Sequence, residues 1–181
     1  MFNDKQRPTD KLNPLSGGDK AGQAKENVAK LTDMMERGET KTDFARLGWD
    51  TDAQYDRDTN TILVAEDYHS VMEQEPALLE PVLAHERVHA AYQGDDPTDE
   101  ASLQAYVDEE MAAYQAEYEA WQGVKEQYTS PEGRARLDPA AKELVAHYEF
   151  KIEQIEQSGW EGYRTKLEQE YRRRMETRRD G

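Results

Sequence analysis

The segment from Ala77 to Tyr92 constrains the fold more than any other part of the sequence. Apolar residues lie on nearly all of its helical faces, although charged residues make up 34% of the chain and hydrophobic residues only 36%. A helix that is apolar all round is stable only when other elements cover it. Pro81 is compatible with the first turn of a helix, so the regular helix is expected to begin near Glu80. We therefore expect the rest of the chain to bury this helix.

The remaining sequence predicts a small sheet before the buried helix and more helices after it. Residues 42–47 are a candidate strand, and residues 53–67 resemble two short strands joined by a polar turn at Asp56–Asn60. Apolar residues recur at helical spacing in the segments 21–37, 100–127, 138–157 and 160–178. The expected fold class is α+β and predominantly helical, with a small antiparallel sheet ahead of the buried helix.

The length of 181 residues is that of one ordinary domain. Residues 1–20 are polar and hold two prolines and two glycines, so we expect a flexible N-terminal arm followed by a single domain over 21–180. The N-terminal residues contain no apolar run of signal-peptide length. This predicts a cytoplasmic protein, or one that is secreted without a cleaved signal peptide.

Charge and cysteine content exclude several classes of partner and site. The formal net charge of −16 disfavours nucleic acid, whose phosphates need Lys and Arg, and it disfavours anionic membranes. The basic segment 164–179 is a local exception, which we interpret as a solvated helix end. Because the chain has no cysteine, any metal ion must be bound by His, Asp or Glu.

The buried segment contains the motif His85-Glu86-Arg87-Val88-His89, with two of the four histidines of the chain. Histidines four residues apart project from the same face of a helix, close enough to share one cation. Neutral imidazole is a good ligand of Zn²⁺. Glu86 is placed to take a proton from a water bound at that cation and to pass it to a leaving amine. The motif therefore predicts a zinc site, with Glu86 as a catalytic base.

A catalytic zinc of this kind needs a third protein ligand and one open position. The next long helix offers Glu109 and Glu110. By helical phase, Glu110 shares an inward stripe with Leu103, Val107, Tyr114 and Trp121, whereas Glu109 lies on a neighbouring strip with Ala105, Ala112 and Ala116. We favour Glu110 as the third ligand, and Glu109 remains the alternative.

Three other interpretations stay open. The histidines could be solvated or satisfied by hydrogen bonds within an acidic helical interaction protein. The protein could instead be a helical binding or adaptor protein with a structural zinc site, or an inactive peptidase relic. A water in the fourth coordination position favours an enzyme, and a protein ligand there favours a structural site.

The motif HERVH, followed by a glutamate within EExxAY on the next helix, resembles the gluzincin branch of the zincin metallopeptidases. The similarity covers roughly residues 52–121, and the size resembles minimal gluzincins and the metallopeptidase domains of bacterial toxins and effectors. The resemblance implies zinc on His85, His89 and Glu110, Glu86 as general base and acid, and a protein or peptide substrate. It also implies that an edge strand near Ile62–Ala65 pairs with the extended substrate.

This sequence departs from the family pattern at Tyr114, where the E-x-x-A-D form has an aspartate. The hydrogen-bond partner of a zinc-binding histidine must therefore come from elsewhere. A transition-state oxyanion also needs a second donor across the cleft. The candidates are His147, Tyr114, Tyr118 and Tyr148, and of these we select His147 and Tyr114.

Overall fold

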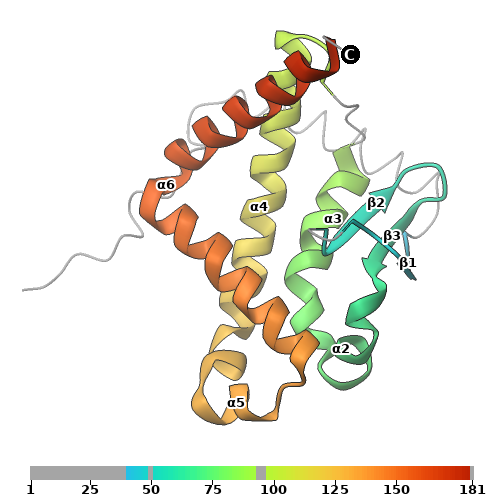
Figure 1. Cartoon of the computed structure of the whole chain (residues 1–181), viewed down its shortest axis with the longest axis vertical. Coiled ribbons are helices and arrows are strands. Elements are labelled where there is room, and N and C mark those ends of the chain that lie inside the picture. Colours follow the sequence, from blue (N-terminus) through green and yellow to red (C-terminus); the bar gives the residue numbers. More distant parts are fainter. Residues whose placement is uncertain (1–39, 49–50, 93–96, 180–181) are drawn as a thin grey trace, which may run out of the picture.

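A computed structural model describes residues 40–48, 51–92 and 97–179, and in these ranges the chain is mostly helical with one small sheet. In Figure 1 the sheet lies on one side of α3 (Glu80–Tyr92), and α4 (Glu100–Thr129) lies on the other. The expected class, α+β and predominantly helical, is confirmed. The arm expected at 1–20 and the helix expected at 21–37 fall outside the described residues.

The sheet consists of β1 (Lys41–Ala45), β2 (Ala53–Asp56) and β3 (Thr61–Ala65), in the spatial order β1-β3-β2. β2 and β3 pair antiparallel, whereas β1 pairs with β3 in parallel. The sheet is therefore mixed, and the expectation of an antiparallel sheet is wrong for the β1–β3 pair. The chain reverses direction between β1 and β2 and again between β2 and β3. β3 consequently runs in the direction of β1 and inserts beside it.

The expected turn at Asp56–Asn60 joins β2 to β3. The Asp56 carboxylate accepts hydrogen bonds from the backbone N–H of Asp58 at 3.0 Å and from the Thr59 hydroxyl at 2.7 Å. Asn60 has a φ of 49°, in the left-handed region that asparagine tolerates better than most residues. These contacts fix a tight hairpin whose outer strand, β2, faces α3.

The strand expected to lie at the sheet edge is instead central. β3 is hydrogen-bonded on both sides, and Ile62 and Val64 are 2% and 0% exposed. An apolar run of this kind suits a strand that is covered on both faces. β2 is the sheet edge next to α3, so the expectation of an edge at Ile62–Ala65 is wrong.

The apolar segment forms α3 after two shorter elements, α2 (His69–Gln74) and the 3₁₀ turn η3 (Pro76–Leu79). The regular helix begins at Glu80, as expected, with Pro81 in its first turn. Its buried residues include Val82, Leu83 and Ala90, and Leu78 and Leu79 just before it are 0% exposed. The helix is therefore covered on most of its faces.

The helix α4 packs along α3 and makes its most extensive contacts there. It begins with a capping box, in which the Asp99 carboxylate accepts from the Ser102 backbone N–H at 2.8 Å and the Ser102 hydroxyl contacts the Asp99 backbone N–H at 3.0 Å. This cap satisfies backbone donors that the first turn would otherwise leave unpaired. It fixes the start of the helix that carries Glu109 and Glu110.

The chain then passes through the short helix α5 (Pro131–Arg136) into α6 (Pro139–Arg179). α6 is broken at Gly159, where φ is 67° and ψ is 165°, so the expected helices at 138–157 and 160–178 are two arms of one bent element. Figure 1 shows the arms forming a V across α4. The first arm buries Leu144, Tyr148 and Ile155 in the core, and the second buries Tyr163 and Leu167.

None of the helices in the described ranges is both long and apolar enough to span a membrane.

Candidate metal centre

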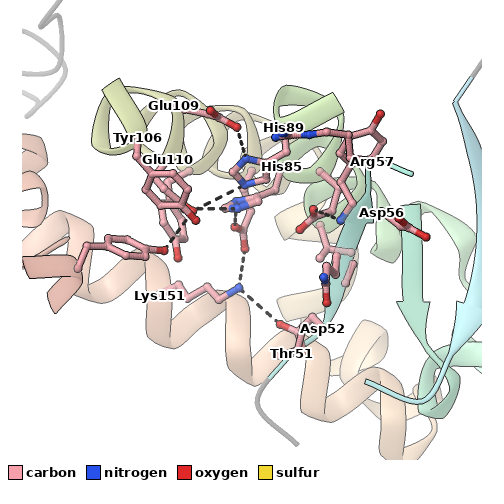
Figure 2. A pocket seen from close by; sticks show the side chains of 18 of the residues that line it. Thr51, Asp52, Asp56, Arg57, His85, His89, Tyr106, Glu109, Glu110 and Lys151 are labelled. Carbon is pink, nitrogen blue, oxygen red and sulfur yellow. Dashed lines mark hydrogen bonds and ion pairs between the residues drawn. The ribbon is translucent and has the colours of Figure 1, made fainter. Parts of the chain in front are cut away.

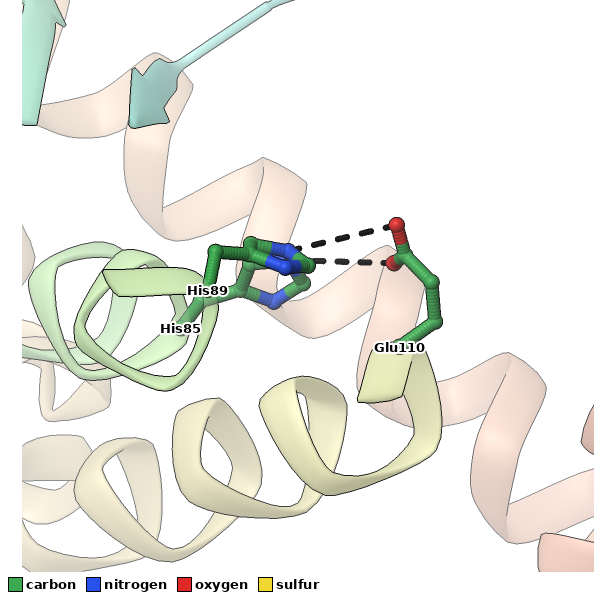
Figure 3. Close-up of side chains that lie close together, drawn as sticks. All are labelled: His85, His89 and Glu110. Carbon is green, nitrogen blue, oxygen red and sulfur yellow. Dashed lines mark ion pairs between the residues drawn. The ribbon is translucent and has the colours of Figure 1, made fainter. Parts of the chain in front are cut away.

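Three side chains from two helices meet beside the sheet. His85 and His89 project from α3, and Glu110 projects toward them from α4 (Figure 3). One ligand atom from each residue lies within 4.8 Å of the other two. The Nε2 atoms of both histidines are 3.9 Å from an oxygen of Glu110. The group is largely shielded from solvent, since His85 is 9% exposed and Glu110 is 5% exposed.

The histidines of this group are four residues apart, so α3 presents both rings on one face. Their ring centroids are 5.0 Å apart. Arg87, between them, lies on the exposed side of α3 and pairs with Glu80, so it does not enter the group. Two imidazoles and one carboxylate on rigid helices form a set of donors that could hold a metal ion.

Each histidine has a second carboxylate partner, also from α4. The Nδ1 atom of His89 is 2.8 Å from Glu109, and the Nδ1 atom of His85 is 3.0 Å from Glu117. Because a carboxylate accepts, each contact places the ring proton on Nδ1 and leaves the Nε2 lone pair facing Glu110. Glu109 and Glu117 therefore fix the orientation of the two rings, the role that such partners have beside metal-binding histidines.

At Glu117 and at His89, burial and the neighbouring charges have opposing effects on the pKa, and the charges prevail. Burial alone would raise the pKa of Glu117, but the charge of Lys151 and the hydrogen bond from His85 outweigh burial and lower it. Burial alone would lower the pKa of His89, but the hydrogen bond to Glu109 and the charge of Glu110 raise it. Glu117 thus stays ionised near neutral pH and accepts a hydrogen bond from the Nδ1–H group of His85.

Glu86 lies on α3 beside the histidine pair and is 6% exposed. Its Oε2 atom accepts a hydrogen bond of 2.8 Å from the backbone N–H of Tyr55 in β2. Burial raises the pKa of Glu86, while the nearby histidines and the Tyr55 N–H act against that rise. The hairpin therefore holds this carboxylate at the edge of the sheet, next to the histidine pair.

Tyrosines surround Glu110 and His85. The Tyr171 hydroxyl, from the second arm of α6, donates to Glu110 at 3.1 Å, and Tyr106 packs edge-to-face on Tyr171. The Tyr114 ring packs edge-to-face on His85, with ring centroids 4.7 Å apart, and on Tyr163. Burial raises the pKa of Tyr114 well above its usual value, so its hydroxyl keeps its proton.

The group opens into a cleft of about 720 Å³ (Figure 2). β2 and the following turn form one wall, and α3, α4 and α6 form the rest. Its lining includes Asp52, Tyr55, Glu86, Glu110, Tyr114 and Lys151. The cleft brings the edge of the sheet, Glu86 and the donor group to one place.

The structure brings together all but one of the residues selected from the sequence for the site, and also the alternative ligand Glu109. His85, Glu86, His89, Glu110 and Tyr114 all line the cleft, and His147 does not. Instead, the Nδ1 atom of His147 is 3.1 Å from Asp52, and the side chain is 41% exposed. Of the other oxyanion candidates, Tyr148 donates to the backbone oxygen of Leu78 and Tyr118 to Glu156.

Sequence reasoning missed Glu117, Lys151 and Asp52, and it assigned Glu109 only the role of an alternative ligand. Glu117 follows Glu110 by seven residues and so shares its face of α4, which is the signal that could have identified it. Lys151 and Asp52 lie far from the motif along the chain, and no periodic pattern marks them. Only tertiary contacts place them at the site, where Lys151 on α6 reaches both Glu117 on α4 and Asp52 just before β2.

Comparison of the chain with protein-family models, with curated proteins and with solved structures found no match.

Proposed function

We propose that this protein is a zinc-dependent peptidase that hydrolyses a peptide bond in a protein or peptide substrate. The observation that carries the proposal is the convergence of His85, His89 and Glu110 beside Glu86. Two imidazoles and one carboxylate are a common ligand set for catalytic zinc, and they leave one coordination position open. With bonds of about 2.0–2.1 Å, tetrahedral donors lie roughly 3.3 Å apart. The Nε2 atom of His85 lies 3.9 Å from Oε2 of Glu110, and the Nε2 atom of His89 lies 3.9 Å from Oε1, which is close to that spacing.

Bound zinc would polarise a peptide carbonyl and lower the pKa of a coordinated water. Glu86 takes a proton from the attacking water and passes it to the leaving amine. The Oε2 atom of Glu86 is held by the Tyr55 N–H, and we assign the Oε1 atom to the water. Tyr114 retains its hydroxyl proton and lines the cleft, so it is the candidate donor to the developing oxyanion.

The substrate would bind in extended form along β2. β2 is the edge strand of the sheet beside the cleft, and strand addition recognises the backbone of a peptide more than its side chains. Tyr55 lies on this strand and holds Glu86. A peptide aligned on β2 would therefore pass close to both the general base and the metal ligands.

The proposal is tested by incubating zinc-loaded protein, purified without a His-tag, with a complex peptide library. New N-termini are then identified by mass spectrometry. The wild type should generate cleavage products, and Glu86→Gln should bind zinc but generate none. Glu126→Gln, an exposed glutamate on α4, is the matched control and should cleave like the wild type. A wild type that cleaves nothing, or a Glu86→Gln protein that cleaves normally, would contradict the proposal.

A further inference from the structure

Lys151, from the first arm of α6, lies between two carboxylates in the wall of the cleft (Figure 2). Its Nζ atom is 3.1 Å from Glu117 and 3.5 Å from Asp52. The side chains of Glu117 and Asp52 are only 4% and 10% exposed. Two buried carboxylates without a cation would be strongly unfavourable, so the ammonium group is needed to compensate them.

The two oxygens of Glu117 have different partners. Oε1 contacts Lys151 at 3.1 Å, and Oε2 contacts the Nδ1 atom of His85 at 3.0 Å. A carboxylate bound at both oxygens has little freedom to rotate. The ammonium group therefore fixes the acceptor that orients the ring of His85.

Asp52, the second carboxylate partner of Lys151, is fixed to the sheet. Asp52, just before β2, accepts a hydrogen bond of 2.7 Å from the Tyr68 hydroxyl, and its Oδ1 atom lies 3.1 Å from His147. The backbone oxygen of Asp52 accepts from the Ala65 N–H at 2.9 Å. Asp52 is thus held on several sides, and Lys151 is the link from this anchor to Glu117.

We propose that Lys151 is a positioning residue for the metal centre, acting through Glu117 to hold the Nε2 atom of His85 toward Glu110. The proposal rests on the metal-binding part of the proposed function and is independent of peptide hydrolysis. From the sequence, His147 is expected to be an oxyanion donor in the cleft. It instead contacts Asp52 from outside the cleft.

The test compares the zinc affinities of full-length variants by competition with a chromophoric chelator. Lys151→Met removes the charge and keeps an unbranched side chain, and Lys151→Arg keeps the charge. Lys151→Met should weaken zinc binding by roughly 10- to 100-fold, the range observed when an orienting partner of a metal ligand is lost. Lys151→Arg should restore most of the affinity. Lys142→Met, exposed on the same helix, is the control and should bind zinc like the wild type.

A double-variant cycle tests whether Lys151 acts through Glu117. If it does, Lys151→Met should weaken zinc binding much less in a Glu117→Gln background than in the wild type. Independent, additive losses would overturn the proposed route. So would a folded Lys151→Met protein that binds zinc with wild-type affinity.

A loss of fold is separated from a loss of positioning by circular dichroism and by the ¹⁵N spectrum of the imidazoles in the metal-free protein. The wild type should show His85 protonated at Nδ1, and folded Lys151→Met should show a mixture of ring states. If Lys151→Met does not fold, the double variant Lys151→Met/Asp52→Asn is measured instead. It removes one positive and one negative charge, so it leaves fewer uncompensated carboxylates. Wild-type zinc affinity in that variant would overturn the proposal.

The outcome is distinguishable from that of the peptidase proposal. If zinc binding depends on Lys151 but the protein cleaves no peptide, the positioning role is supported and the peptidase proposal is contradicted. Cleavage by the wild type together with unchanged zinc affinity in Lys151→Met would do the reverse. A wild type that binds no zinc would overturn both.

Discussion

Each histidine of the pair has its own buried glutamate on α4. The sequence, with Tyr114 in place of an aspartate of the gluzincin pattern that it resembles, predicts that the hydrogen-bond partners of the histidines come from other residues. Glu109 contacts His89 at 2.8 Å and Glu117 contacts His85 at 3.0 Å. Tyr114 instead packs edge-to-face on His85. The hydrogen-bond partners of the two histidines thus lie on α4, on either side of Tyr114.

The different contacts of Glu109 and Glu110 predict different losses of zinc affinity on substitution by alanine. Glu109→Ala should weaken zinc binding by roughly 10- to 100-fold, because it removes the partner of His89 but no metal ligand. Glu110→Ala removes a proposed ligand and should weaken binding further. Chelator competition measures both affinities. A larger loss in Glu109→Ala than in Glu110→Ala would identify Glu109 as the ligand instead.

At single residues, the sequence was informative where local geometry decides the outcome. Spacing along one helix was enough to place His85 and His89 together, and helical phase was enough to favour Glu110. Phase alone put Glu109 on a neighbouring strip, yet it is 4% exposed because α3 covers both positions. The place of His147 depends on Asp52, which is 95 residues away in sequence, and no local pattern encodes such a contact.

At the scale of elements, the bend in α6 brings Tyr171 to the candidate metal centre. The first arm ends near Gly159, and the second arm returns across α4 so that Tyr171 contacts Glu110 (Figure 1). The φ of 67° and ψ of 165° at Gly159 belong to a region that is essentially restricted to glycine. This one residue therefore permits the return of the arm.

Gly159→Ala should destabilise the protein by about 1–3 kcal/mol, the usual cost of a strained backbone conformation. The cost is one of backbone strain alone, because a Cβ at this position meets nothing within 4 Å. Gly123→Ala is the matched control. It lies inside α4 with equally open space, and alanine there should stabilise the helix by about 1 kcal/mol. Urea unfolding measures both changes, and equal effects of the two substitutions would contradict this explanation of the bend.

The start of α6 predicts a pH-dependent contribution to stability. Asp138 accepts from the Ala141 N–H and from the Ser70 hydroxyl, both at 2.7 Å, and these hydrogen bonds lower its pKa below the ordinary value of 3.8. A lowered pKa stabilises the fold above the unfolded-state value, and the contribution disappears as the pH falls through the folded-state value. Asp138→Ala should cost about 1 kcal/mol at pH 6.

The difference between wild type and Asp138→Ala should shrink below the ordinary Asp pKa. Urea unfolding curves at neutral and acidic pH provide the measurement. A difference that is constant across this range would show that the charge of Asp138 plays no part in the cap.

Element positions were largely predictable, and element pairing was not. The hairpin, the start of α3 and the break near residue 159 follow from turn residues, proline and glycine. The parallel pairing of β1 with β3 does not follow from such signals. No local pattern decides whether β1 pairs with β2 or with β3. The short helices α2 and α5 were also missed, since six residues each are too few for a periodic pattern to be recognised.

At the scale of the whole molecule, the site joins side chains and backbone groups from β2, α3, α4 and α6. The backbone of β2 holds Glu86. α4 supplies Glu109, Glu110 and Glu117. α6 adds Tyr171 and Lys151. The protein carries a net charge of −16, yet Glu86, Glu109, Glu110 and Glu117 are all buried at this one place. Burying so many carboxylates is costly unless cations compensate them, and a bound divalent ion would add two positive charges.

The central claim is that His85, His89 and Glu110 bind one zinc ion that keeps an open position. X-ray absorption at the zinc edge, on stoichiometrically loaded protein purified without a His-tag, tests it most directly. We expect one zinc per chain, coordinated by two imidazole nitrogens, a carboxylate and a non-protein oxygen. Failure to retain stoichiometric zinc, or a shell filled entirely by protein ligands, would contradict it.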